Sequence, residues 1–293
     1  MGWKTHVAAA AIRNRIPFGN ALRRLKRRLF GYAPDDANLR TTLGNFDEMR
    51  KALAQVGRSF VDATVFEIGS GWFPTIPVML SAAGARKVIM SDVTPHLDKG
   101  TLAAALAFVK PHFEGRAISE ASNLADLRLD YLAPFDAALL EDASLDVVVS
   151  RTVLEHIPPD ELRSLLILLR PKLAATGVMV HCVDHSDHLE HRDKSISRIN
   201  FLTWSNRRHR FVNWLLKGGE NRLRHHEYLA LFDECGYDVV VESGSPHRQT
   251  LELAESLSLS ERFAGMTAEQ VSILSSIFVL VPRRPGAVGH QDD

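Results

Sequence analysis

Short apolar segments alternate with longer amphipathic ones from about residue 61 to residue 183. This alternation predicts a parallel sheet whose strands are joined by helices. The strand-like segments are residues 65–68, 87–92, 117–130, 146–150 and 178–183, of which 117–130 is the weakest. Helical patterns follow at residues 74–84, 94–109 and 159–173. We therefore expect an α/β fold, a doubly wound and mostly parallel sheet with helices on both faces.

The pattern changes at both ends of this region. A helix at residues 226–235 and strands at 237–242 and 275–281 would complete a sheet of seven strands, the last two forming an antiparallel hairpin. The expected divisions are an N-terminal helical extension (1–60), a main domain (61–283) with an insertion after its fifth strand (184–224), and a polar tail (284–293). A helix near residues 38–56 is placed to close over a bound cofactor.

The clearest local signal is the turn Gly69-Ser70-Gly71, which follows the first strand and its acid, Glu67. Glycines let the backbone turn sharply and approach a ligand where a Cβ would collide. Glu67 would repel a pyrophosphate but attract an ammonium group. Asp92 ends the next strand 21 residues after Gly71, at the spacing of a ribose-binding acid. The predicted ligand therefore joins a cationic amino-acid end to a ribose.

These features resemble the class I S-adenosylmethionine-dependent methyltransferases, whose first motif is an apolar strand, an acid and G-x-G. Residues 144–150 resemble the fourth strand of that family, and residues 151–158 (Arg-Thr-Val-Leu-Glu-His-Ile-Pro) resemble its signature loop. The resemblance covers residues 60–183 and implies methyl transfer with S-adenosyl-L-methionine as cofactor. The cofactor-binding residues that it implies are Glu67, Gly69, Ser70, Gly71, Asp92, Asp130, Ser150 and Arg151. Asp130 enters as the acid that the family often places near the adenine.

Methyl transfer from a sulfonium requires alignment of the two reactants and, for a hydroxyl acceptor, removal of a proton. A histidine that is oriented by a carboxylate suits that role. The candidates, at the ends of the fourth and fifth strands, are Glu155, His156, Asp184, His185 and His188. Glu155 and His156 are equally well read as residues that only tether the loop before Pro158. We expect O-methylation of a small-molecule or sugar-like acceptor, bound between the insertion and the N-terminal helices.

A divalent metal is a second interpretation of the same region, because seven of the 13 histidines lie between His181 and His226 with acids among them. Some members of the family hold magnesium with carboxylates. No ligand spacing here is diagnostic, however, and Thr152 stands where some relatives carry an acid three residues before the glutamate of the loop. The sequence therefore assigns no residue to a metal.

Three further side chains of the insertion, Asn221, Arg222 and Arg224, would either bind an anionic or polyhydroxylated substrate or pair with neighbouring acids.

Two other functions stay open. One is an NAD- or nucleotide-sugar-dependent oxidoreductase, which Glu67 and the missing third glycine disfavour. The other is a non-catalytic, cofactor-binding partner subunit.

Composition adds limits on partners and location. The chain has 35 basic and 35 acidic residues, so its overall charge gives no reason to expect a nucleic acid partner. Residues 20–30 carry five cations and three leucines on one face, which fits either contact with an anionic membrane or lipid-linked substrate, or a solvated helix packed by its leucines. Two cysteines, no membrane-length apolar run and no signal-peptide core favour a cytoplasmic protein. The oligomeric state is not predicted.

Overall fold

The computed structural model describes residues 2–15, 36–113 and 116–283. The expectations for the basic segment 20–30 and for the tail 284–293 fall outside these residues. Within the described chain, no helix combines the length and the hydrophobicity that a bilayer span requires.

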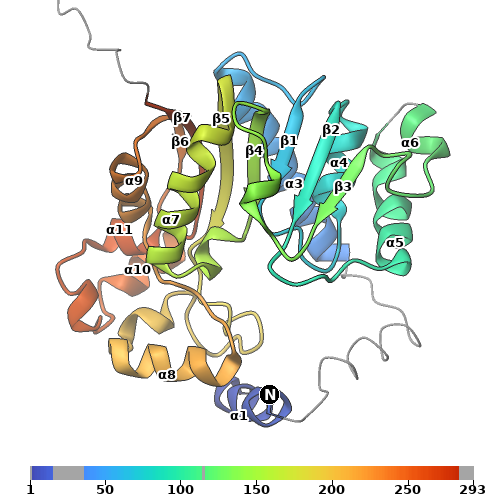
Figure 1. Ribbon diagram of the computed structural model, residues 1–293. Helices are drawn as coiled ribbons and strands as arrows, with labels where there is room; N and C mark the ends of the chain where they lie inside the picture. Colours follow the sequence, from blue (N-terminus) through green and yellow to red (C-terminus); the bar gives the residue numbers. More distant parts are fainter. Residues whose placement is uncertain (1, 16–35, 114–115, 284–293) are drawn as a thin grey trace, which may run out of the picture.

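A seven-stranded sheet forms the centre of the molecule, with the strand order β3-β2-β1-β4-β5-β7-β6 (Figure 1). Its strands are β1 (Thr64–Glu67), β2 (Lys87–Ser91), β3 (Leu129–Leu132), β4 (Leu145–Arg151), β5 (Leu173–Asp184), β6 (Tyr237–Ser243) and β7 (Ser275–Pro282). The first five are parallel, and β7 runs antiparallel to both β5 and β6. The predicted doubly wound sheet and its closing hairpin are confirmed.

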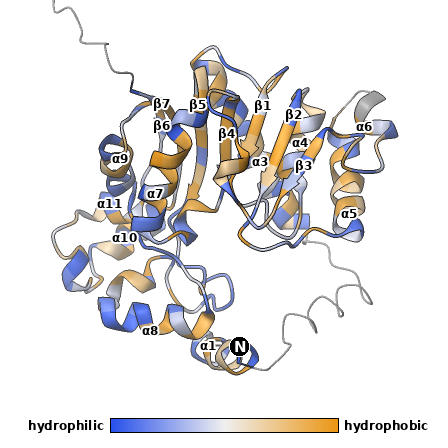
Figure 2. Cartoon of the chain, viewed as in Figure 1, coloured by the Kyte–Doolittle hydropathy of each residue, from blue (hydrophilic) through white to orange (hydrophobic). Residues whose placement is uncertain are grey.

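Helices cover both faces of the sheet because successive side chains of a buried strand point to opposite sides. Val147 and Val149 of β4 belong to one apolar core with α3, α4, α5 and α6, whereas Val148 belongs to a second core with α7 and α9. These helices are α3 (Asp36–Gln55), α4 (Thr75–Ala82), α5 (Lys99–Val109), α6 (Arg116–Glu120), α7 (Pro159–Leu169) and α9 (His225–Glu234). The strand β1 and helix α5 are accordingly among the most hydrophobic elements (Figure 2).

A third apolar core holds together three segments that are distant in the sequence, and we call them the cap: residues 2–15, 185–224 and 244–274. Its helices are α1 (Trp3–Arg13), η5 (Asn200–Thr203), α8 (Asn206–Leu216), α10 (Arg248–Ala254), η6 (Glu261–Phe263) and α11 (Ala268–Ser272). Trp3 of α1 stacks on Trp204 with ring centroids 5.0 Å apart, and Val7, Val212 and Phe263 share the core. The N-terminal helix therefore packs on the insertion, beside α8 (Figure 1).

Three local expectations differ from the structure. The third strand covers only Leu129–Leu132, since residues 116–120 form α6. Helix α5 begins later than residue 94, because the Asp98 carboxylate accepts the backbone N–H of Thr101 and caps the helix there. The excursion between β6 and β7, residues 244–274, carries α10, η6 and α11, which were not predicted.

Candidate functional site

The turn after β1 has the sharp backbone conformation that its glycines predict. Gly69 and Gly71 have φ of 71° and 64°, values that L side chains rarely adopt. A Cβ on Gly69 would lie 2.7 Å from Cγ1 of Val153, so the position also lacks space for a side chain. The N–H of Gly71 donates to Oδ2 of Asp92 over 2.9 Å, which ties the turn to the end of β2.

Glu67 ends β1 beneath this turn and is only 3% exposed. The Ser70 hydroxyl donates a hydrogen bond to its Oε2. Burial raises the pKa of Glu67 to about 8; Asp92 adds to this shift, while the Ser70 hydrogen bond and the charge of Arg151 oppose it. The carboxyl group is therefore mostly protonated at pH 7 in the free protein. A cation placed against it would favour the ionised form.

A cavity of about 270 Å³ lies over Glu67 and the glycine turn, and we call it the smaller cavity. Its wall comes from the turn, from α3 and from the end of β4, and it includes Asn38, Thr42, Glu67, Gly69, Ser70, Gly71, Trp72, Phe73, Arg151, Thr152 and Val153. Five of the predicted cofactor residues, Glu67, Gly69, Ser70, Gly71 and Arg151, thus meet at one place.

Asp92 lies beside the smaller cavity rather than in its wall. Its side chain is 11% exposed, and its oxygens accept the N–H groups of Gly71 and Thr94. Each carboxylate oxygen can accept a second hydrogen bond. Trp72 stacks on His96 next to this carboxylate, with ring centroids 3.7 Å apart. Asp92 therefore holds the turn in shape and keeps some capacity to accept further hydrogen bonds.

The structure corrects two predicted cofactor residues. Asp130 lies inside β3, where it is 63% exposed and forms an ion pair of 2.7 Å with Lys87 at the start of β2, away from the carboxyl ends of the strands. Ser150 is fully buried in β4, and its Oγ lies 2.8 Å from Nδ1 of His181. Neither side chain lines the smaller cavity, because one pairs on the surface and the other within the sheet.

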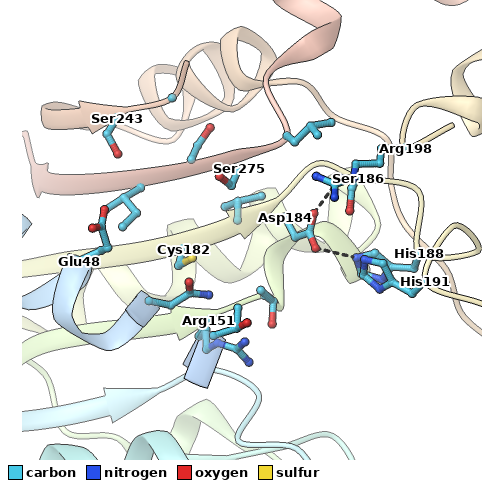
Figure 3. Close-up of a pocket in the computed structure, with 18 of the residues that line it drawn as sticks. Glu48, Arg151, Cys182, Asp184, Ser186, His188, His191, Arg198, Ser243 and Ser275 are labelled. Atoms are coloured by element: carbon cyan, nitrogen blue, oxygen red, sulfur yellow. Dashed lines mark hydrogen bonds and ion pairs between the residues drawn. The ribbon is translucent and has the colours of Figure 1, made fainter. Parts of the chain in front are cut away.

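A second cavity of about 1050 Å³, the larger cavity, adjoins the first and shares Asn38, Arg151 and Thr152 with it. Its polar wall includes Asn38, Thr41, Asn45, Glu48, Arg151, Asp184, Ser186, His188, Glu190, His191, Lys194, Arg198, Ser243, Ser245, Ser275 and Ser276. Figure 3 shows Glu48 and Arg151 on one side of it and Asp184, His188 and His191 on another. Ligands of open α/β sheets bind beyond the carboxyl ends of the strands, and both cavities lie there.

Thr152 stands at the junction of the two cavities and has φ of 51°. The left-handed conformation is unfavourable for a β-branched residue, and such strain clusters at functional sites. Its N–H donates to the carbonyl of Cys182 over 2.8 Å, so the end of β5 holds the strained residue in place. Neither Thr152 nor the strain at this position was predicted as part of a ligand site.

Asp184 and His188 form a polar corner of the larger cavity (Figure 3). Oδ2 of Asp184 lies 3.4 Å from Nε2 of His188, and Oε1 of Glu220 lies 3.0 Å from Nδ1 of the same ring. Burial by itself would lower the pKa of His188, but the hydrogen bond to Asp184 and the nearby carboxylates raise it to about 9. Burial by itself would raise the pKa of Asp184, but His188 and the hydrogen bonds from Ser186 hold it below its usual range. This corner is an ionised pair at neutral pH.

His185 does not reach the larger cavity, contrary to the expectation from its position after β5. It is 2% exposed, its Nε2 lies 2.8 Å from the Ser276 hydroxyl, and its Nδ1 lies 3.1 Å from the carbonyl of Leu223. Burial and the charge of Arg224 lower its pKa well below the ordinary value. Both ring nitrogens are therefore engaged in holding β5, β7 and the insertion together.

His191 lines the larger cavity and was not singled out from the sequence. Its ring stacks on His188 with centroids 5.2 Å apart. Burial and the positive charge of His188 lower the pKa of His191, so this imidazole is neutral near pH 7. A second missed set lies on α3, where Asn38, Thr41, Asn45 and Glu48 recur every three or four residues and face the cavity. That spacing was the available signal, since it defines one face of a helix.

Glu155 and His156 occupy the short helix η3 (Leu154–His156) directly behind the polar corner. Glu155 is 2% exposed, and neither of its carboxylate oxygens makes a hydrogen bond within the described chain. Burial raises its pKa to about 8; the charge of Asp184 adds to this shift, while the backbone N–H groups of Glu155 and Asp184 and the charge of His188 oppose it. Ligand atoms of Glu155, His156 and His188 lie within 4.8 Å of one another. These three residues are therefore a set of donors that could hold a metal ion.

The polar residues of the insertion have structural partners. The Asn221 amide donates to the carbonyls of Leu154 and Ile157 over 2.8 and 2.9 Å. Arg222 and Arg224 are 3% and 0% exposed, and their guanidinium groups donate mainly to backbone carbonyls. Neither arginine lines the larger cavity, so neither is placed to grip a ligand there, and their guanidinium groups bond to carbonyl and amide oxygens rather than to acids of the insertion.

Comparison of the sequence with protein-family models and with curated proteins gave no match. Among solved structures, the chain is similar to magnesium protoporphyrin IX methyltransferase from Synechocystis, at 15% identity and a TM-score of 0.48, over 94% of this chain and 100% of that one. It is also similar to an S-adenosylmethionine-dependent methyltransferase from Mesorhizobium loti, at 15% identity and a TM-score of 0.44, over 78% of this chain and 95% of that one. A third similar structure is phosphoethanolamine N-methyltransferase 2 from Haemonchus contortus, at 14% identity and a TM-score of 0.48, over 82% of this chain and 54% of that one.

These likenesses are too distant to assign an activity, but the strand order decides the architecture. Five parallel strands in the order 3-2-1-4-5, followed by an antiparallel β7 inserted between β5 and β6, are the arrangement expected for the family. The fold is that of class I methyltransferases. In this methyltransferase fold the smaller cavity lies at the ends of β1 and β4, and the cap stands over the larger one.

Proposed function

We propose that this protein transfers a methyl group from S-adenosyl-L-methionine to a hydroxyl group of a small, polar acceptor. The observation that carries the proposal is the pair of adjoining cavities. One holds a buried acid under a glycine turn, and the other is large and polar. They meet at Arg151 and Thr152, where a methyl group could pass between their ligands.

The smaller cavity suits the amino-acid end of the cofactor. Glu67 would accept the ammonium group, because a cation stabilises the ionised form of a buried carboxyl. Gly69 and Gly71 leave the backbone open to close approach by the ligand. Asp92 would accept the ribose hydroxyls with the lone pairs that its bonds to Gly71 and Thr94 leave unused.

The larger cavity suits an acceptor that carries several hydroxyl groups. Five serine hydroxyls, two asparagine amides and charged groups of both signs line it, and its apolar side chains are few: Cys182, Val183, Leu274 and Ile277. An apolar acceptor would leave those polar groups without hydrogen-bond partners, which costs about 1–3 kcal/mol for each buried group. Arg198 and Lys194 add positive charge to the wall that the cap contributes.

His191 is the group best prepared to take the proton of the acceptor hydroxyl. Its lowered pKa leaves it neutral, whereas the raised pKa of His188 leaves that ring protonated and unable to accept a proton at pH 7. Asp184 stays ionised and is suited to accept a hydrogen bond that orients the acceptor. The role of base, predicted for His185 or His188, therefore passes to His191.

Mass spectrometry of the purified protein for bound cofactor or its demethylated product, followed by calorimetric titration, tests the cofactor. We expect S-adenosyl-L-methionine to bind with one site per chain and NADH not to bind. Saturable binding of NADH without binding of S-adenosyl-L-methionine would overturn the proposal in favour of an oxidoreductase. Methyl uptake from labelled cofactor into a panel of polyhydroxylated acceptors then tests the reaction, and cofactor binding with no uptake by any acceptor would favour a non-catalytic subunit.

A further inference from the structure

We propose that Glu155, His156 and His188 form a binding site for a divalent transition-metal ion, behind the wall of the larger cavity. One ligand atom from each residue lies within 4.8 Å of the other two. The histidine-rich sequence gave no diagnostic spacing, because the donors come from two loops that only the fold brings together. This inference does not depend on methyl transfer.

The first support is the carboxylate of Glu155. The side chain is 2% exposed, both oxygens are shielded from solvent, and neither makes a hydrogen bond of good geometry within the described chain, although the backbone N–H groups of Glu155 and Asp184 lie close enough to lower its pKa. A buried carboxyl without partners is costly, and buried charges in proteins are paired or coordinate metals. Its oxygens lie next to the two imidazoles. The orphaned group thus faces the donors that a cation would need.

The second support is the orientation of both imidazole rings. Nδ1 of His188 lies 3.0 Å from Oε1 of Glu220, and Nδ1 of His156 lies 3.3 Å from the carbonyl of Gly219. Both partners can only accept a hydrogen bond, so each Nδ1 carries a proton. The lone pair of each Nε2 is therefore the one left to bind a metal ion. Histidine ligands of metals almost always donate their other ring N–H to a carboxylate or a backbone carbonyl. Two adjacent residues of the insertion provide that arrangement for both rings.

The third support is a further carboxylate at the same place. Oδ2 of Asp184 lies 3.4 Å from Nε2 of His188 and is suited to complete the coordination, and it also faces the larger cavity. A divalent ion would offset two of the three negative charges of Glu155, Asp184 and Glu220, and it would replace the proton on Nε2 of His188. Two imidazoles with one or two carboxylates suit zinc, cobalt, iron or nickel better than magnesium, which prefers oxygen ligands.

Cobalt(II) is the probe for this site, because its visible absorption reports the coordination. The full chain, freed of any affinity tag and stripped with a chelator, is dialysed against Co²⁺ and its metal content is measured. We expect about one ion per chain, displaced by equimolar Zn²⁺ but not by a hundredfold excess of Mg²⁺. A content below about 0.1 ion per chain, or displacement by Mg²⁺, would overturn the proposal.

Variants locate the ion. His156→Ala and Glu155→Gln should each weaken Co²⁺ binding at least tenfold, and Glu220→Gln about 10–100-fold as a residue that orients a ligand. The matched control is His191→Ala, which removes the imidazole stacked on His188 without removing a ligand and should bind Co²⁺ like the wild type. Because His156 is exposed, its variant is expected to fold, and circular dichroism verifies this. Unchanged binding in folded His156→Ala, or equal loss in His191→Ala, would place the ion elsewhere.

Discussion

Two buried glutamates lie near the ends of neighbouring strands and differ in what surrounds them: Glu67 ends β1, and Glu155 lies in η3 just after β4. Both are at most 3% exposed, and burial raises the pKa of each to about 8. Glu67 accepts a hydrogen bond from Ser70, three residues along its own turn. Glu155 makes no hydrogen bond of good geometry within the described chain, and its polar neighbours Asp184 and His188 come from the end of β5 and the loop after it.

The site around Glu67 is formed mainly by residues close together in the sequence, and we call it the local site. The site around Glu155 is formed by segments distant in the sequence, and we call it the assembled site. The turn that surrounds Glu67 is specified within a few residues, and hydrogen bonds to Ser91 and Asp92 tie it to the end of the next strand. The loop that carries Glu155 and His156 is held by Asn221 of the insertion, and these two residues face His188, which belongs to the cap. We expect the local site to serve the cofactor and the assembled one to decide which acceptor is used. The following predictions test that division.

The largest effect is expected in the assembled half, from His191→Ala. Loss of a general base should lower the rate of methyl transfer about 10²–10⁴-fold. Steady-state kinetics with saturating acceptor would measure it, and calorimetry should give unchanged affinity for S-adenosyl-L-methionine. His112→Ala, an exposed imidazole outside both cavities, is the control. A rate within twofold of the wild type would show that another group takes the proton.

In the local half, Glu67→Gln should abolish most of the cofactor affinity. Removing one charge of a buried, hydrogen-bonded pair costs about 2–5 kcal/mol, which corresponds to a loss of about 30-fold or more in affinity. Calorimetric titration is the measurement, and Glu48→Gln in the larger cavity should leave the affinity within twofold. Equal losses in both variants would mean that the two cavities do not divide the ligands as proposed.

Cofactor affinity should also depend on pH through Glu67. Its raised pKa means that the free protein holds a proton there below about pH 8, and the ammonium of the cofactor favours the ionised carboxylate. Binding at pH 7 should therefore release close to one proton, and affinity should rise several-fold from pH 6.5 to pH 8. Titration in buffers of different ionisation enthalpy counts the protons. Glu67→Gln, which cannot ionise, should show no such release, and an identical release in it would refute the assignment.

The smallest effect is expected from Asn221→Ala, which removes the amide donor to the carbonyls of Leu154 and Ile157. Losing these two hydrogen bonds should lower the free energy of unfolding by about 1–3 kcal/mol, although the Leu154 carbonyl still accepts the N–H of Ile157. Urea denaturation would measure that loss. Cofactor affinity should stay within twofold while acceptor turnover falls, because the loosened loop belongs to the assembled half. A larger loss of cofactor affinity than of turnover would contradict the division between a local cofactor site and an assembled acceptor site.

Local chemistry made much of the fold predictable. The glycine turn, Asp92 and the order of strands and helices followed from the sequence, because φ preferences and apolar periodicity act over a few residues. The third strand was misplaced, and Asp130 with it, since an edge strand of four residues is too short to show a clear apolar period. The helices between β6 and β7 were missed because their apolar residues pack on the other two segments of the cap, which the local pattern does not reveal.

The sequence by itself determined a doubly wound sheet with a buried acid under a glycine turn, since both depend on the order of neighbouring residues. Only the tertiary structure decided the fates of three nearby histidines. His185 is buried against Ser276, His188 is held between Asp184 and Glu220, and His191 faces the larger cavity. The physical reason is that the role of an imidazole depends on its burial and on the charges around it, and residues far along the chain provide both.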